Sequence, residues 1–188
     1  MITRSSCFLL ILVFAAPLLS SQNNIESKLN EVLGKFLSCE TPIDDSSPCN
    51  RFVSRALNDA YGIDDFKHPT KKDEYLLANE IAAYVATSPK WVFIGNASEQ
   101  DVLDAAVKYA QQRRAVIAVK SAQGSGHVAI VLPGQQTLSA TWKLRVPRSA
   151  SFFLGRPKES FVGEPLSKVW QSPAEVKLYA REFSRNER

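Results

Sequence analysis

Apolar residues recur every three or four positions through much of the first half of the chain, a spacing that predicts amphipathic helices. We expect helices over residues 24–37, 50–61, 73–86 and about 98–113. Short runs rich in β-branched residues predict strands at 91–94, 115–119, 127–132 and 151–154. A Pro-Gly pair at 133–134 predicts a turn, so residues 137–146 should return as the hairpin partner of 127–132.

The order of these elements, helices first and strands mostly later, indicates the fold class. Such an order is typical of an α+β domain with an antiparallel sheet. We therefore predict N-terminal helices packed on an antiparallel sheet, with residues 175–183 fitting either a strand or a helix. Residues 22–188 fit a single domain by length, and such a chain can bury a core without metal or disulfide staples.

The first 21 residues have the features of a secretory signal peptide. Arg4 supplies a short positive region, an apolar run covers residues 7–19, and the small residues Ser20 and Ser21 follow. The run is shorter than the ~20 apolar residues that a membrane-spanning helix needs. A buried core helix is the alternative explanation. We expect cleavage after residue 21, secretion to the extracellular space and no membrane insertion.

Charge is unevenly distributed along the chain. Without the signal peptide, 22 Lys or Arg face 19 Asp or Glu, which gives a net charge of 22 − 19 = +3. Residues 143–188 hold ten Lys or Arg and five Glu, so the excess lies at the C-terminal end. Such a surface suits an anionic polymer such as a bacterial cell wall, although a solvated basic face is the plainer explanation. No basic motif interleaved with aromatics indicates a nucleic-acid partner.

Two cysteines and two histidines follow the signal peptide, so the candidates for chemistry are few. Cys49 lies in the stretch PCNRFV, where a loop is expected to become a helix. The unpaired N–H groups and the positive dipole end of a helix N-terminus lower the pKa of a thiol, which makes the sulfur nucleophilic at neutral pH. The same N–H groups can cradle an oxyanion. Cys49 is therefore the candidate nucleophile.

Cys39 offers a competing explanation for Cys49. Two cysteines in a secreted chain usually pair, and the loop between these two is short enough to close. A Cys39–Cys49 disulfide would then be structural. A reversible bridge combines both ideas, because it would hold an enzyme inactive until the bridge is reduced.

His127 is the candidate general base. It lies at the start of the expected strand GHVAIV, directly after a loop that contains glycines. From this position the imidazole can reach across a cleft to a thiol on a helix. A structural histidine is the alternative, and His68, in a polar loop, is the weaker candidate base. A third group usually orients such a base. The expected hairpin places Ser139 opposite His127, with Thr141 and the two glutamines at 135–136 as weaker options.

No set of His and Cys residues has the spacing of a zinc site, and no glycine-rich loop has the pattern that binds phosphate. We therefore expect neither a metal nor a cofactor.

Together, the stretches PCNRFV and GHVAIV resemble the papain-like peptidoglycan amidases, which include the NlpC/P60 and CHAP groups. The chain size, the spacing from Cys to His and the segment FVG at 161–163 are most similar to the type VI secretion amidase effectors, particularly the second family. The resemblance covers most of residues 22–188. It implies a papain-like fold, Cys49 as nucleophile, His127 as base and a third position near Ser139. It also implies hydrolysis of peptide stems or of the D-alanyl–diaminopimelate cross-link.

The signal peptide is a departure from the bacterial effectors, which usually lack one. In this respect the chain resembles the domesticated, secreted effectors of ticks and mites, whose role is antibacterial defence. We expect a secreted cysteine amidase or endopeptidase that acts as a monomer on bacterial peptidoglycan. One alternative is a non-catalytic wall-binding module with a Cys39–Cys49 disulfide. Another is a thiol protease that acts on ordinary proteins.

Overall fold

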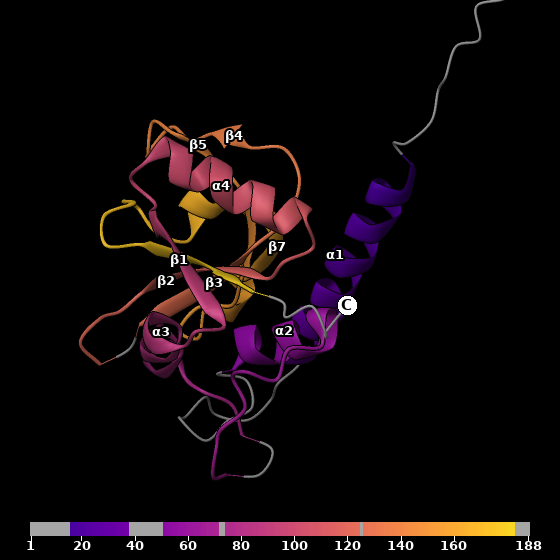
Figure 1. Ribbon diagram of the computed structural model, residues 1–188, viewed down its shortest axis with the longest axis vertical. Helices are drawn as coiled ribbons and strands as arrows, with labels where there is room; N and C mark the ends of the chain where they lie inside the picture. The colour runs from indigo at the N-terminus through magenta and orange to yellow at the C-terminus, as the bar shows by residue number, and fades with distance from the viewer. Residues whose placement is uncertain (1–15, 38–50, 72–73, 125, 183–188) are drawn as a thin grey trace, which may run out of the picture.

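The computed structural model describes residues 16–37, 51–71, 74–124 and 126–182 (Figure 1). The α-helices in this part of the chain are α1 (Ala16–Leu37), α2 (Phe52–Tyr61), α3 (Ala78–Thr87) and α4 (Gln100–Gln111). They accompany strands whose pairings are antiparallel, so the expected α+β class is confirmed. None of the described helices is both long and apolar enough to cross a membrane.

The main sheet is antiparallel throughout and has the strand order β1-β8-β2-β3-β6-β7. Its strands are β1 (Trp91–Asn96), β2 (Val116–Lys120), β3 (His127–Val131), β6 (Arg148–Ser151), β7 (Phe161–Pro165) and β8 (Lys177–Arg181). A separate ribbon pairs β4 (Thr137–Leu138) with β5 (Arg145–Val146). Strand β3 is therefore a central strand between β2 and β6, and His127 lies at its beginning.

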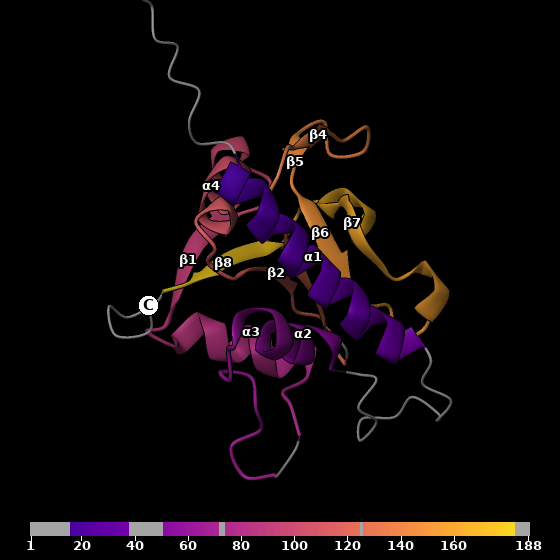
Figure 2. The same cartoon turned by 90° about the vertical axis from the view of Figure 1, so that its right-hand side faces the viewer.

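Both faces of the central strands are buried. Side chains alternate along these strands, so neighbouring residues pack in different cores. In β3, Val128 and Ile130 belong to an apolar core that also holds residues of α1, α2 and α3. Ala129 and Val131 belong to a second core, formed with α4. Figures 1 and 2 accordingly show α4 on one side of the sheet and the three N-terminal helices on the other.

Helix α2 is held in the first core by α1 and by the chain that leaves β6. Helix α1 buries one apolar face, made of Ile25, Leu29, Val32 and Leu33. Near its end, Phe36 meets Phe52 edge-on, with 5.7 Å between ring centroids, and meets Phe152 at 5.5 Å. Aromatic pairs at this separation contribute beyond their area burial. The first turn of α2 is thus anchored beside the end of β6.

Two ion pairs join the N-terminal part of the chain to the sheet, one from the turn after α2 and one from α1. Asp65 accepts hydrogen bonds from Arg181 of β8 at 2.7 and 3.3 Å, and from the Trp91 indole at 3.0 Å. Both members of this ion pair are almost completely buried. Glu26 of α1 accepts two hydrogen bonds from Arg148 of β6, at 2.7 and 3.0 Å. These contacts connect segments that are far apart in the sequence.

The prediction that residues 137–146 form the hairpin partner of β3 is wrong. The two ends of this segment pair with each other as β4 and β5, and β6 takes the place beside β3. The segment closes locally because Ser139 exchanges backbone hydrogen bonds with Lys143 and Leu144. The ambiguous segment 175–183 contains strand β8, which pairs with β1 and β2.

Candidate functional site

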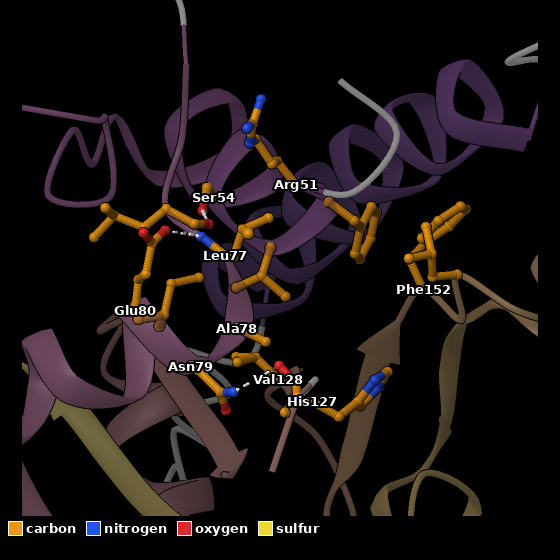
Figure 3. A pocket seen from close by; sticks show the side chains of 16 residues that line it. Arg51, Ser54, Leu77, Ala78, Asn79, Glu80, His127, Val128 and Phe152 are labelled. Atoms are coloured by element: carbon orange, nitrogen blue, oxygen red, sulfur yellow. Dashed lines mark hydrogen bonds between the residues drawn. The ribbon is translucent and has the colours of Figure 1, made fainter. Parts of the chain in front are cut away.

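A pocket of about 250 Å³ opens where α2, α3 and the β2–β3 loop meet (Figure 3). The start of α2 and the segment that enters α3 form one wall. The loop before β3 and the chain after β6 form the other. The lining residues are 51–54, 76–81, Gly124, Gly126, His127, Val128, Phe152 and Leu154.

Polar contacts fix the start of α2 against the segment that leads into α3. Arg51 is buried, and its guanidinium lies 3.4 Å from the Glu74 carboxylate. The Ser54 hydroxyl donates to the Leu76 carbonyl oxygen at 3.3 Å. Arg51 is also the N-cap of α2 and makes no side-chain cap to it. The positive end of the α2 dipole therefore lies at this wall of the pocket.

Asn79 of α3 holds the loop that leads into β3 through both ends of its side-chain amide. Its nitrogen donates to the carbonyl oxygens of Ala122 and Gly124 at 3.0 and 3.1 Å, and its oxygen accepts the Ala122 N–H at 3.4 Å. A Cβ atom at Gly126 would lie 2.2 Å from the Asn79 oxygen, so the close approach requires glycine. Helix α3 thus positions the residue immediately before His127.

The His127 imidazole is packed among aromatic rings and beside a serine. Its Nε2 atom lies 2.7 Å from Ser151 Oγ. The Phe153 ring stacks on it with 5.1 Å between centroids, and Trp170 meets it edge-on at 5.6 Å. Burial lowers the pKa of His127 to about 4, because the charged ring would lose its hydration. The imidazole is therefore neutral at neutral pH in this environment.

The His127 side chain lies on the α4 side of the sheet. Alternation along β3 places it on the same face as Ala129, and its neighbour Trp170 packs against that same core. Val128, which packs in the core that contains α2, is on the opposite face, and Figure 3 shows the imidazole directed away from it. His127 still lines the pocket, since it is the first residue of β3 at the end of the sheet.

Ser139 makes no hydrogen bond to His127 in the described part of the chain. Its hydroxyl lies 3.1 Å from that of Thr141 and accepts the Trp142 backbone N–H at 3.1 Å. The expected orienting role depended on a hairpin that does not form, so the neighbour of the imidazole is Ser151 instead. Ser139 is connected to the site only indirectly, because the Trp142 indole donates to the backbone of Trp170 at 2.9 Å.

The cysteines lie outside the described residues, and so does any pairing between Cys39 and Cys49. Cys49 precedes Arg51, a pocket residue, by two positions in the sequence. His68 does not line the described pocket. Its Nδ1 atom accepts the backbone N–H groups of Thr70 and Lys71 at 3.3 and 3.2 Å, which is a turn-closing role.

Sequence reasoning missed Ser151 and Asn79 as parts of this site. Ser151 was expected to begin a strand, but its position beside His127 depends on which strand is the neighbour of β3. Asn79 stands in an ordinary helical stretch, and its contacts reach more than 40 residues along the chain. No local signal in the sequence marks either role.

Within the described segments, no group of three or more His, Cys, Asp or Glu side chains is arranged to hold a metal ion. No protein-family model matches the sequence, and no curated protein matches it.

Proposed function

We propose that this protein is a secreted cysteine hydrolase that cleaves peptide bonds in bacterial peptidoglycan, with Cys49 as nucleophile and His127 as general base. One observation carries the proposal. The same pocket is lined by His127 and by residues 51–54, which follow Cys49 almost directly in the sequence. Two peptide units separate Cys49 from Arg51, and such a span is at most about 7 Å.

The start of α2 supplies the electrostatics that this chemistry needs. A helix N-terminus stabilises negative charge through its dipole and its unpaired N–H groups. It can therefore stabilise first a thiolate and then the oxyanion of a tetrahedral intermediate. The packing of Phe52 against Phe36 and Phe152 keeps this end of the helix fixed.

A neutral His127 can accept the Cys49 proton, although burial opposes the charge that it acquires. A thiolate next to the ring would raise the pKa of His127 again, because an opposite charge favours the protonated form. Proton transfer and formation of the ion pair are therefore coupled, so that the imidazolium is favoured only while the thiolate is present.

The reaction that we propose proceeds through a thioester. His127 takes the thiol proton, and the sulfur attacks the peptide carbonyl, whose π electrons move to oxygen. Collapse of this intermediate breaks the C–N bond, and His127 returns its proton to the departing amine. Water then loses a proton to His127 and attacks the thioester carbonyl. The carboxylic acid leaves and the Cys49 thiolate recovers its proton.

Two sequence features support peptidoglycan as the substrate class. The stretches around Cys49 and His127 resemble the papain-like peptidoglycan amidases, and that resemblance implies a peptide stem or the D-alanyl–diaminopimelate cross-link as the target. The basic excess within residues 143–188 suits an anionic wall polymer. The papain-like fold and the antibacterial role belong to this same proposal.

A second candidate is a secreted wall-binding module without catalytic activity, in which Cys39 and Cys49 form a disulfide. The packing of His127 favours it, because the ring lies on the α4 face of the sheet, opposite to α2. A ring held there between Phe153 and Trp170 with a pKa near 4 also suits a structural histidine. In that case, Cys49 would carry no reactive thiol.

Thiol alkylation distinguishes the two candidates. We expect iodoacetamide to modify Cys49 in a Cys39→Ser variant at neutral pH much faster than it modifies the same thiol in urea-unfolded protein. The His127→Gln variant should lose this enhancement, and mass spectrometry of the peptides measures both rates. If folded Cys49 reacts no faster than unfolded Cys49, the thiol is not activated and the hydrolase proposal fails.

A further inference from the structure

The His127 ring is confined by aromatic neighbours that do not define its orientation completely. Phe153 on one face and Trp170 at an edge fix the plane of the ring. A rotation of 180° about the bond to the ring exchanges nitrogen and carbon positions but leaves the shape almost unchanged. Stacking alone therefore does not determine where each ring nitrogen lies.

The Ser151 hydroxyl provides the polar contact that distinguishes the two orientations. Ser151 is completely buried, and its oxygen lies 2.7 Å from Nε2. In the flipped ring a carbon would occupy the Nε2 position, so a buried hydroxyl would lose its bond. Among the described residues, Nδ1 has no hydrogen-bond partner. The hydrogen bond at one nitrogen thus leaves the other available.

We propose that Ser151 is the positioning residue of His127, accepting a hydrogen bond from Nε2–H and leaving Nδ1 as the basic nitrogen. This inference rests on the proposed function, since only Nδ1 with a free lone pair can take the Cys49 proton. When Nδ1 is protonated, both ring nitrogens are donors, and only an accepting partner fits Nε2. A hydroxyl that already accepts from Nε2–H needs no rearrangement during proton transfer.

A matched control lies on the same strand. Ser149 is also completely buried, and its hydroxyl donates to the Glu164 carbonyl oxygen at 3.2 Å rather than to the imidazole. Ser149→Ala therefore removes a buried hydroxyl of β6 without touching His127. Ser151→Thr keeps the hydroxyl and tests for rescue of the Ser151→Ala variant.

The test is a two-bond proton–nitrogen NMR correlation on protein labelled with ¹⁵N-histidine. The chain has two histidines, so a His127→Gln variant assigns the signals. At neutral pH, we expect Nε2 of His127 to be protonated in the wild type, in Ser149→Ala and in Ser151→Thr. Ser151→Ala should show a mixture of tautomers. A wild-type ring protonated only at Nδ1, or an unchanged Ser151→Ala spectrum, would overturn the proposal.

Kinetics on peptidoglycan fragments supply the second measurement. We expect Ser151→Ala to lower kcat roughly tenfold with little change in KM, the size expected for one lost hydrogen bond to the base. Ser151→Thr should recover most of this loss. An unchanged kcat in Ser151→Ala would overturn the positioning role. An inactive wild type with an Nε2-protonated ring would overturn the proposed hydrolase instead, so the two failures are distinguishable.

Discussion

Acidification should destabilise this protein through His127, and the effect can be isolated by comparison with His127→Gln. The unfolded chain gives histidine its ordinary pKa of about 6.5, whereas burial lowers the pKa in the folded state to about 4. At a pH between these two pKa values, His127 is protonated in the unfolded state and mostly neutral in the folded state. The free energy of unfolding should therefore fall as the pH drops from about 6.5 to about 4, and level off below.

The magnitude follows from the difference between the two pKa values. Each pKa unit corresponds to about 1.4 kcal/mol, so burial of the ring alone should lower the free energy of unfolding by about 3 kcal/mol relative to the matched His127→Gln protein. Other carboxylates, such as the buried Asp65, also titrate in acid, but their contribution is common to both proteins and cancels. Urea unfolding followed by tryptophan fluorescence, from about pH 8 to about pH 4, measures this difference.

The same comparison in a Cys49→Ala background separates burial from ion pairing. Without the thiol, the full loss of about 3 kcal/mol should remain, because only burial acts on the ring. With the thiol, a neighbouring thiolate should raise the pKa of His127 and make the acid-induced loss smaller. If Cys49→Ala and the double variant Cys49→Ala/His127→Gln show parallel stability curves across this range, burial does not lower the pKa of His127 as described.

Three further predictions test contacts that hold the site in place. Asp65→Ala should lower the free energy of unfolding by about 3–5 kcal/mol, because it leaves Arg181 buried without its carboxylate; a loss below about 1 kcal/mol would contradict this. Gly126→Ala should lower the free energy of unfolding by about 1–3 kcal/mol, because the added methyl group meets the Asn79 side chain. In an Asn79→Ala background the same substitution should cost less, and fully additive losses would show that no clash exists. Glu26→Gln should lower the free energy of unfolding, measured in urea, by about 1 kcal/mol, because it removes the ion pair with Arg148. The loss should be smaller at high salt, and a loss that is independent of salt would argue against an ion pair.

Most elements were predictable because their signals are local. Helices α2 and α4 lie within two residues of the expected bounds, since their apolar positions follow the helical period on one buried face. Strands β2 and β3 are short runs of β-branched and small apolar residues that fill both cores. Helix α3 begins later than expected, at Ala78, where the Glu80 side chain caps the Leu77 N–H at 2.7 Å.

Pairing between strands was less predictable, because it is not encoded locally. The turn at Pro133-Gly134 favoured an immediate hairpin, but the chain forms the β4–β5 ribbon first and pairs β6 with β3 afterwards. Strand β7 contains glycine and ends in proline, both of which are unfavourable in strands, and it gave no strand signal.

The wrong partner expected for β3 explains why Ser139 was expected beside His127 in place of Ser151. Ser139 and Ser151 are chemically equivalent candidates, and only the identity of the strand beside β3 decides which hydroxyl reaches His127. The place of His127 at the start of a strand was predictable, because it follows glycines and opens a run of β-branched residues, which needs no knowledge of pairing.

The most direct test of the proposed hydrolase is digestion of purified peptidoglycan sacculi by the reduced protein and by its Cys49→Ala variant, with the soluble fragments identified by mass spectrometry. We expect the wild type to release fragments whose masses correspond to a cleaved peptide bond, and the variant to release none. If the reduced wild type releases no more than the variant, the protein is not a peptidoglycan hydrolase that uses Cys49, and the wall-binding module becomes the better account.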